Sequence, residues 1–91
     1  MKLGAYRPLE RLVRGFSNHR RIQIMDLLSA EPELSVEEIA SQLHINNKTA
    51  AAHVQRLAIA GLVMKRNEGA SVRHKLTHRS KLILKFLRTL A

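Results

Sequence analysis

The stretch Ser35–Val63, SVEEIASQLHINNKTAAAHVQRLAIAGLV, decides the fold of this chain. It opens on a capping box, in which the Ser35 hydroxyl accepts a hydrogen bond from the Glu38 amide and the Glu38 carboxylate reaches back to the Ser35 amide. An apolar stripe at helical spacing follows, made by Val36, Ile39, Ala40 and Leu43. These signals predict a short helix over 36–43.

A second helix is predicted over 47–60, directly after a turn of three residues. Asn46 is a good N-cap for it, and Gly61 suits the left-handed conformation in which many helices end. One face of this helix is apolar and consists of Ala50, Val54, Leu57 and Ala58. Two helices joined in this way have the geometry of a helix-turn-helix.

The residues after Gly61 change from helical to alternating hydrophobicity. Leu62–Arg66 and Ser71–Leu76 predict the two strands of a β-hairpin, joined by a loop of about four residues over 67–70. A hairpin directly after the second helix is typical of the winged variant of the motif.

The rest of the chain is predicted to be helical. Three further helices are expected: 8–16 with Pro8 at its first position, one that begins after Ser17 or Asn18 and ends near Ala30, and 78–90 after the cap Thr77. The chain is therefore expected to be mainly α with a small β-hairpin, a winged helix-turn-helix in the order α-α-α-α-β-β-α. No repeat or linker interrupts it, so we expect one domain over 1–91.

Charge separates the chain into basic and acidic parts. The net charge is +9, from 16 Lys and Arg against 7 Asp and Glu. Residues 22–47 carry five acids and no Lys or Arg, whereas 1–21 carry six bases and one acid, and 48–91 ten bases and one acid. This segregation is typical of a nucleic-acid-binding protein.

Composition also limits the compartment and the chemistry. The chain has no cysteine, which excludes disulfides and thiolate metal sites within it. No run of about 18 apolar residues exists, so no transmembrane segment is predicted, and the N-terminus lacks the apolar core of a signal peptide. We expect a soluble, cytoplasmic protein associated with the nucleoid.

The run IASQLHINNKTAAAHVQRLAIAGLVMKRNEG resembles the winged-helix regulators of the ArsR type, and the resemblance covers about 9–76. The residues that fit the family pattern are Thr49, His53, Val54, Leu57, Ala60, Gly61, Leu62 and Val63. Two departures stand out: His44 occupies a turn position that is usually Gly, and Ala51 one that is usually Ser. At His44 we therefore expect either a slightly strained connection or a positive φ, and a hydroxyl contact to DNA is not available at residue 51.

The resemblance implies that double-stranded DNA is the partner and that the helix over 47–60 enters its major groove. Asn and Gln suit adenine, an alanine can contact a thymine methyl, and Lys and Arg suit phosphate or a narrow minor groove. The predicted DNA-binding residues are Asn46, Asn47, Lys48, Thr49, Ala52, Gln55, Arg56, Arg20 and, in the hairpin, Lys65, Arg66, Arg73 and Lys75, with His74 a further hairpin candidate. His53 is expected to pack beneath the helix.

The first and last helices carry more apolar residues than one small core can cover. In the family that the chain resembles, these two helices pair across a two-fold axis, which implies a homodimer. The predicted interface residues are Leu9, Leu12, Phe16, Leu82, Ile83, Phe86, Leu87 and Leu90.

Neither a metal site nor a catalytic site is predicted. The five histidines lack ligand spacing, and Glu37 and Glu38 are explained by capping, so we expect no cofactor, no metal effector and no enzymatic activity. The favoured function is a dimeric transcriptional repressor on a palindromic operator. The run Ala50–Ala52 keeps a non-specific architectural binder open, and the acidic segment keeps a protein-docking winged helix open.

Overall fold

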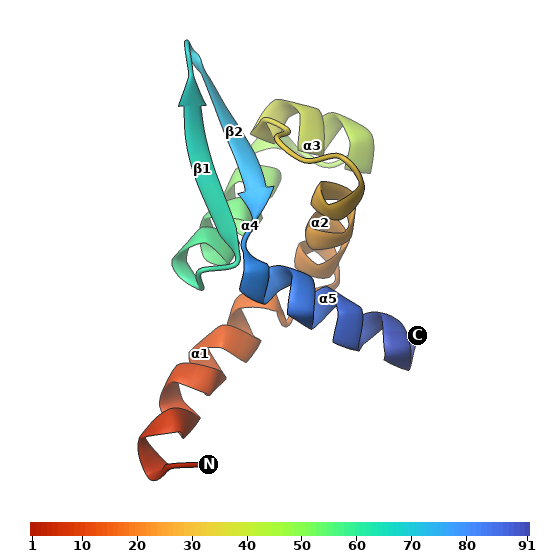
Figure 1. Cartoon of the computed structure of the whole chain (residues 1–91). Helices are drawn as coiled ribbons and strands as arrows, with labels where there is room; N and C mark the ends of the chain where they lie inside the picture. The colour runs from red at the N-terminus through yellow and green to blue at the C-terminus, as the bar shows by residue number, and fades with distance from the viewer.

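The computed structural model describes all residues, 1–91, and has the predicted winged helix-turn-helix fold. The elements are η1 (Leu3–Ala5), α1 (Tyr6–Phe16), α2 (His19–Ala30), α3 (Val36–Leu43), α4 (Asn47–Ile59), β1 (Val63–Glu68), β2 (Ser71–Leu76) and α5 (His78–Leu90). Figure 1 shows α2, α3 and α4 gathered in one body, with the hairpin tip and the N-terminal end of α1 at opposite ends of the molecule. The elongated shape measures 43 × 28 × 21 Å.

The core forms where α2, α3 and α4 meet the base of the hairpin and α5. The buried apolar residues are Ile24, Met25, Leu28, Leu34, Ile39, Ala40, Ala50, Val54, Leu57, Leu62, Val63, Leu76 and Leu84. The predicted stripes of α3 and α4 supply five of them, as the helical period requires. No residue of α1 is fully buried, but Leu12 and Phe16 pack against the edge of this core.

Local side-chain caps begin the helices where the sequence predicted. Asn18 accepts from the Arg20 and Arg21 amides, Asn46 from the Lys48 amide and Thr77 from the Ser80 amide. The Ser35–Glu38 capping box is complete in both directions. His44 ends α3 with φ 56°, the left-handed conformation that is one of the two alternatives expected there.

The first helix begins earlier than the sequence predicted. α1 starts at Tyr6 after the short 3₁₀ turn η1, and Pro8 is therefore its third residue rather than its first. Any of the first four helical N–H groups lacks an intrahelical partner, so proline is tolerated at the third position as well as at the first.

The hairpin loop is shorter than predicted. Asn67 and Glu68 belong to β1 and pair with Val72 and Ser71, so the loop has two residues rather than about four. Gly69 is the first of them and has φ 59°, the conformation that a tight hairpin turn requires there. We call the β1–β2 hairpin the wing. Because β1 is longer than predicted, the tip of the wing lies further from the rest of the molecule.

The first helix crosses α4 closely at one point. A Cβ atom built on Gly15 would overlap the Cβ of Ala60, so only glycine allows this approach. The crossing places α1 beside the C-terminal end of α4.

No helix in the structure has the length and apolar character needed to cross a membrane.

Candidate nucleic-acid interface

The exposed surface of α4 carries six of the residues predicted to bind DNA. Asn47, Lys48, Thr49, Ala52, Gln55 and Arg56 are all exposed, whereas Ala50, Val54 and Leu57 are buried. The helix contains no acidic residue. Its exposed side is therefore polar and basic. The small side chains of Ala51 and Ala52 leave the helix backbone accessible in the first two turns.

The N-terminal end of α4 is free to meet an anion. The side chain of Asn46 accepts a hydrogen bond from the Lys48 amide at 2.7 Å and so serves as the cap. Asn47 and Lys48 remain unengaged by other side chains of the chain and project at the positive end of the helix dipole.

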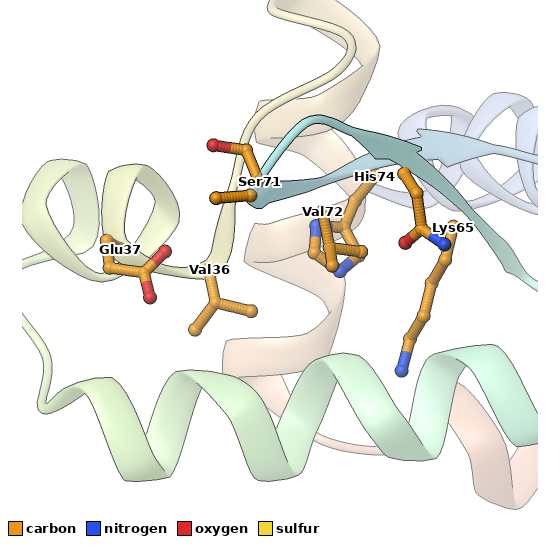
Figure 2. Close-up of a pocket in the computed structure, with 8 residues that line it drawn as sticks. Val36, Glu37, Lys65, Ser71, Val72 and His74 are labelled. Atoms are coloured by element: carbon orange, nitrogen blue, oxygen red, sulfur yellow. The ribbon is translucent and has the colours of Figure 1, made fainter.

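The wing joins α4 through Lys65, whose ammonium donates to the Gln55 side-chain oxygen at 2.9 Å. Figure 2 shows Lys65 pointing from β1 toward α4, across a cavity that also contains Glu37 near the start of α3. The cavity measures about 540 Å³ and separates the wing from α3. Lys65 is thus held beside the exposed side of α4.

Two wing arginines are engaged within the chain. Arg66 makes a bidentate pair with Glu33, at 3.0 and 2.7 Å, and Arg73 donates to Glu38 at 2.6 Å and to Glu68 at 3.2 Å. The Arg66 hydrogen bond lowers the pKa of Glu33, and Glu33 in turn raises the pKa of Arg66. These pairs join the wing to the acidic segment around α3, so that Arg66 and Arg73 contribute less free positive charge than the sequence indicated.

The other wing candidates divide between surface and core. Lys75 is exposed and has no ion-pair partner in the structure. His74 is buried, and its Nδ1 lies 2.9 Å from the Leu34 carbonyl oxygen, so the prediction that His74 is a DNA contact of the hairpin is wrong. His74 shares the inward face of β2 with Leu76, which the alternation of the strand could have indicated.

The start of α2 adds positive charge beside α4. Arg21 and Arg56 line a second cavity of about 320 Å³ together with Ala52 and His53. Arg20 is half-buried and donates to the side chain of Gln23 at 2.9 Å. The predicted phosphate contact of Arg20 therefore lies at the start of α2, where its positive charge acts on His53 of α4.

His53 reports the environment of this second cavity. Partial burial, and then the positive charges of Arg21, His19 and Arg20, lower the pKa of His53 from its usual 6.5. The histidine is half-buried, as expected of a residue that packs beneath α4.

We predict that His53→Gln makes thermal stability less sensitive to acid. A histidine with a lowered pKa in the folded protein stays neutral while the unfolded chain takes up a proton, so stability is lost as the pH falls below about 6.5. Melting temperatures measured from about pH 8 to pH 5 should fall more steeply for the wild-type protein than for the variant. Parallel curves would contradict this account of His53.

The terminal helices expose four of the eight apolar residues predicted for the dimer interface. Leu82, Phe86 and Leu90 of α5 are 56%, 61% and 67% exposed, and Leu9 of α1 is 38% exposed. The remaining predicted residues, Leu12, Phe16, Ile83 and Leu87, are half-buried. Tyr6 and Val13 were not among the predicted residues but extend the same surface with exposed fractions of 53% and 51%.

The histidines do not converge on one site. The structure brings together no group of three or more His, Asp and Glu side chains that could hold a metal ion.

Comparison with known proteins places this geometry in a family. A family model described as winged helix-turn-helix DNA-binding matches residues 17–64. The HTH-type transcriptional regulator Rv0324 of Mycobacterium tuberculosis is 46% identical over 59 residues, which are 65% of this chain and 26% of that protein. The chain thus spans about a quarter of the length of this curated relative.

Two solved structures resemble nearly the whole chain. The homodimeric winged helix-turn-helix DNA-binding domain of Mb0332 from Mycobacterium bovis, a possible ArsR-family transcriptional regulator, is 31% identical with a TM-score of 0.87, over 96% of this chain and 81% of that one. HlyU from Vibrio cholerae is 30% identical with a TM-score of 0.84, over 99% and 97% of the two chains. The chain therefore belongs to the winged helix-turn-helix DNA-binding family, among the regulators of the ArsR type.

Proposed function

We propose that this chain is a dimeric, sequence-specific transcriptional regulator, which represses by occupying a palindromic operator rather than by catalysis. The observation that carries the proposal is the exposed side of α4. It presents Lys48, Gln55 and Arg56 without an acidic neighbour on the helix, and Lys65 of the wing and Arg21 of α2 lie beside it. We expect the protein on nucleoid DNA in the cytoplasm.

Two kinds of contact would share the work of recognition. Asn47 and Gln55 can hydrogen-bond base edges, and the exposed methyl of Ala52 can contact thymine. Lys48 and Arg56 would neutralise phosphates on either side of the groove and so supply affinity without specificity. Small side chains at residues 51 and 52 let the helix backbone approach the floor of the groove closely.

The dimer is supported by the exposed apolar surface of α1 and α5, described above. The similar domain of Mb0332 is homodimeric. A two-fold dimer would place two copies of α4 about 34 Å apart, one turn of DNA, which favours a palindromic site.

The proposal predicts different outcomes for Lys48→Ala and Gln55→Ala. Loss of the Lys48 phosphate contact should weaken binding to all duplexes alike and flatten the plot of log affinity against log salt by about one unit. Loss of the Gln55 base contact should cost about 1–3 kcal/mol on the selected site and little on random duplex. Fluorescence anisotropy with labelled duplexes over a range of salt concentrations measures both quantities.

Lys85→Ala is the matched control for charge, because Lys85 is exposed on α5, away from α4. It should change neither the affinity nor the salt dependence. If Lys48→Ala and Gln55→Ala also leave both quantities unchanged, α4 does not bind DNA, and the protein-docking alternative replaces the proposal.

A further inference from the structure

An open cavity bordered by three helices is lined by four arginines. It measures about 230 Å³ and is lined by Arg11, Arg14, Gly15, Arg21, Arg56, Ile59 and Ala60. Two of the four arginines come from α1, one from the start of α2 and one from α4. We call this cavity the arginine pocket.

The arginine pocket exists because α1 approaches α4 so closely. The contact between Gly15 and Ala60 brings the two helices together. Arg11 and Arg14 lie one turn apart on the same side of α1. Where α1 crosses α4, this side of α1 lies beside Arg56. The guanidinium groups are thus brought together by the fold and not by their spacing in the sequence.

The positive charge in the arginine pocket is barely compensated within the chain. Arg14 has one carboxylate neighbour, Glu10, at 3.5 Å, and both of these side chains are largely exposed. Arg11, Arg21 and Arg56 take part in no ion pair. The wing shows the opposite arrangement, since its arginines are each matched by carboxylates. Four arginines that line one cavity with little counter-charge repel one another, and an anion bound there would offset that repulsion.

Arg21 provides a second, independent sign of a missing partner. Its Nε is buried and has no hydrogen-bond acceptor in the structure. A buried donor without an acceptor is costly, and native structures normally satisfy such groups with protein, water or a ligand. Burial is the main cause of the lowered pKa of the neighbouring His53, and the positive charge of Arg21 lowers it further.

We propose that the arginine pocket binds a phosphate group. The planar guanidinium group donates two parallel hydrogen bonds to phosphate oxygens, and several arginines around one cavity suit a tetrahedral dianion or a phosphodiester. The arginine pocket is a site in addition to the exposed side of α4 that is proposed to bind DNA. It rests on the proposed function only in so far as the phosphate belongs to DNA.

The arginine pocket remains accessible in the proposed dimer. Arg7, Arg11 and Arg14 form one stripe of α1, whereas Leu9, Leu12 and Phe16 form a stripe on the other side of the helix. Pairing through the apolar stripe would therefore leave the arginine stripe facing outward.

A DNA backbone phosphate and a free phosphate are the two sources that fit this chemistry. Arg21 and Arg56 line both the arginine pocket and the cavity beside Ala52 and His53. The positive surface therefore continues from α4 to α1, along a path that a DNA strand could follow. Pyrophosphate serves as the probe for the free anion.

The test compares the wild-type protein with Arg11→Ala/Arg14→Ala and with the control Lys81→Ala/Lys85→Ala. All four side chains are exposed, and both double variants remove two positive charges. In the first arm, the salt dependence of binding to a random-sequence duplex is measured. In the second arm, the melting temperature of the protein alone is followed as pyrophosphate is added, at constant ionic strength.

A phosphate from DNA predicts that Arg11→Ala/Arg14→Ala lowers the salt slope by about one unit while the control does not. A free phosphate predicts that pyrophosphate raises the melting temperature of the wild-type protein and of the control but not of the pocket variant. Either result supports the site and identifies its source.

The site is overturned if neither the salt slope nor the pyrophosphate response distinguishes the pocket variant from the control. The proposed function stands in that case if Lys48→Ala still flattens the salt slope. If the wild-type protein binds no duplex at all, the proposed function fails, and the pyrophosphate arm alone decides about the pocket.

Discussion

The variant Phe86→Glu is expected to be a monomer with at least about 100-fold weaker affinity for the selected operator, a loss of about 2.7 kcal/mol or more. Phe86 is 61% exposed in the single chain, near the centre of the apolar side of α5. A two-fold interface would contain this residue twice, so that one substitution places two carboxylates in it. Burying an unpaired carboxylate in an apolar contact costs several kcal/mol, which exceeds what a small interface can offset.

Analytical ultracentrifugation and operator binding together measure this effect. The monomer itself should fold, because Phe86 lies at its surface and its loss removes little from the core. Lys81→Gln is the control: it makes the same change in net charge on the opposite side of α5 and should leave both the dimer and the affinity unchanged. A Phe86→Glu protein that stays dimeric would show that α5 is not the interface.

Local signals explain why so much of the fold could be predicted from the sequence. Helix starts depend on side chains within three residues of the cap, such as Asn18, Ser35 and Thr77, and all three caps form as predicted. The helical period of the apolar residues predicts which residues of α4 are buried, and therefore also which are exposed. Both are properties of short segments and need no tertiary information.

The hairpin loop was mispredicted because local composition and strand pairing disagree. Asn67, Glu68 and Gly69 read as a turn by residue type. The pairing of the two strands nevertheless extends through Asn67 and Glu68, and Arg73 of β2 pairs with Glu68 of β1. Pairing between strands decided the length of the loop.

The candidate site could be predicted from the sequence only in part, because contacts between distant parts of the chain decide some of its pairings. Residues on α4 could be assigned from periodicity, but the partners of Arg66 and Arg73 lie 33 and 35 residues away, at Glu33 and Glu38. Charge counting had set the acidic segment apart from the basic wing, whereas the fold joins them. Similarly, the arginine pocket depends on the contact between Gly15 and Ala60, which no local pattern indicates.

The wing pairs also bear on specificity. With Arg66 and Arg73 held by carboxylates, the wing offers Lys65 and Lys75 as its free cations. Sequence discrimination would then depend mainly on the N-terminal half of α4 and on Gln55. The arrangement favours few base contacts at close range over many contacts spread along the groove.

We predict that this chain prefers one DNA sequence by about 10³-fold or more over random duplex at physiological salt. Two copies of α4 related by a two-fold axis further predict a site of two inverted half-sites, centred about one helical turn apart.

Selection of binding sites from a pool of random duplexes, followed by competition of the selected sequence against random duplex, measures preference and symmetry together. A palindromic site with that preference is the result expected of a dimeric operator-binding regulator. A preference of less than about tenfold for every selected sequence would contradict the account and identify the protein as a non-specific nucleic-acid binder.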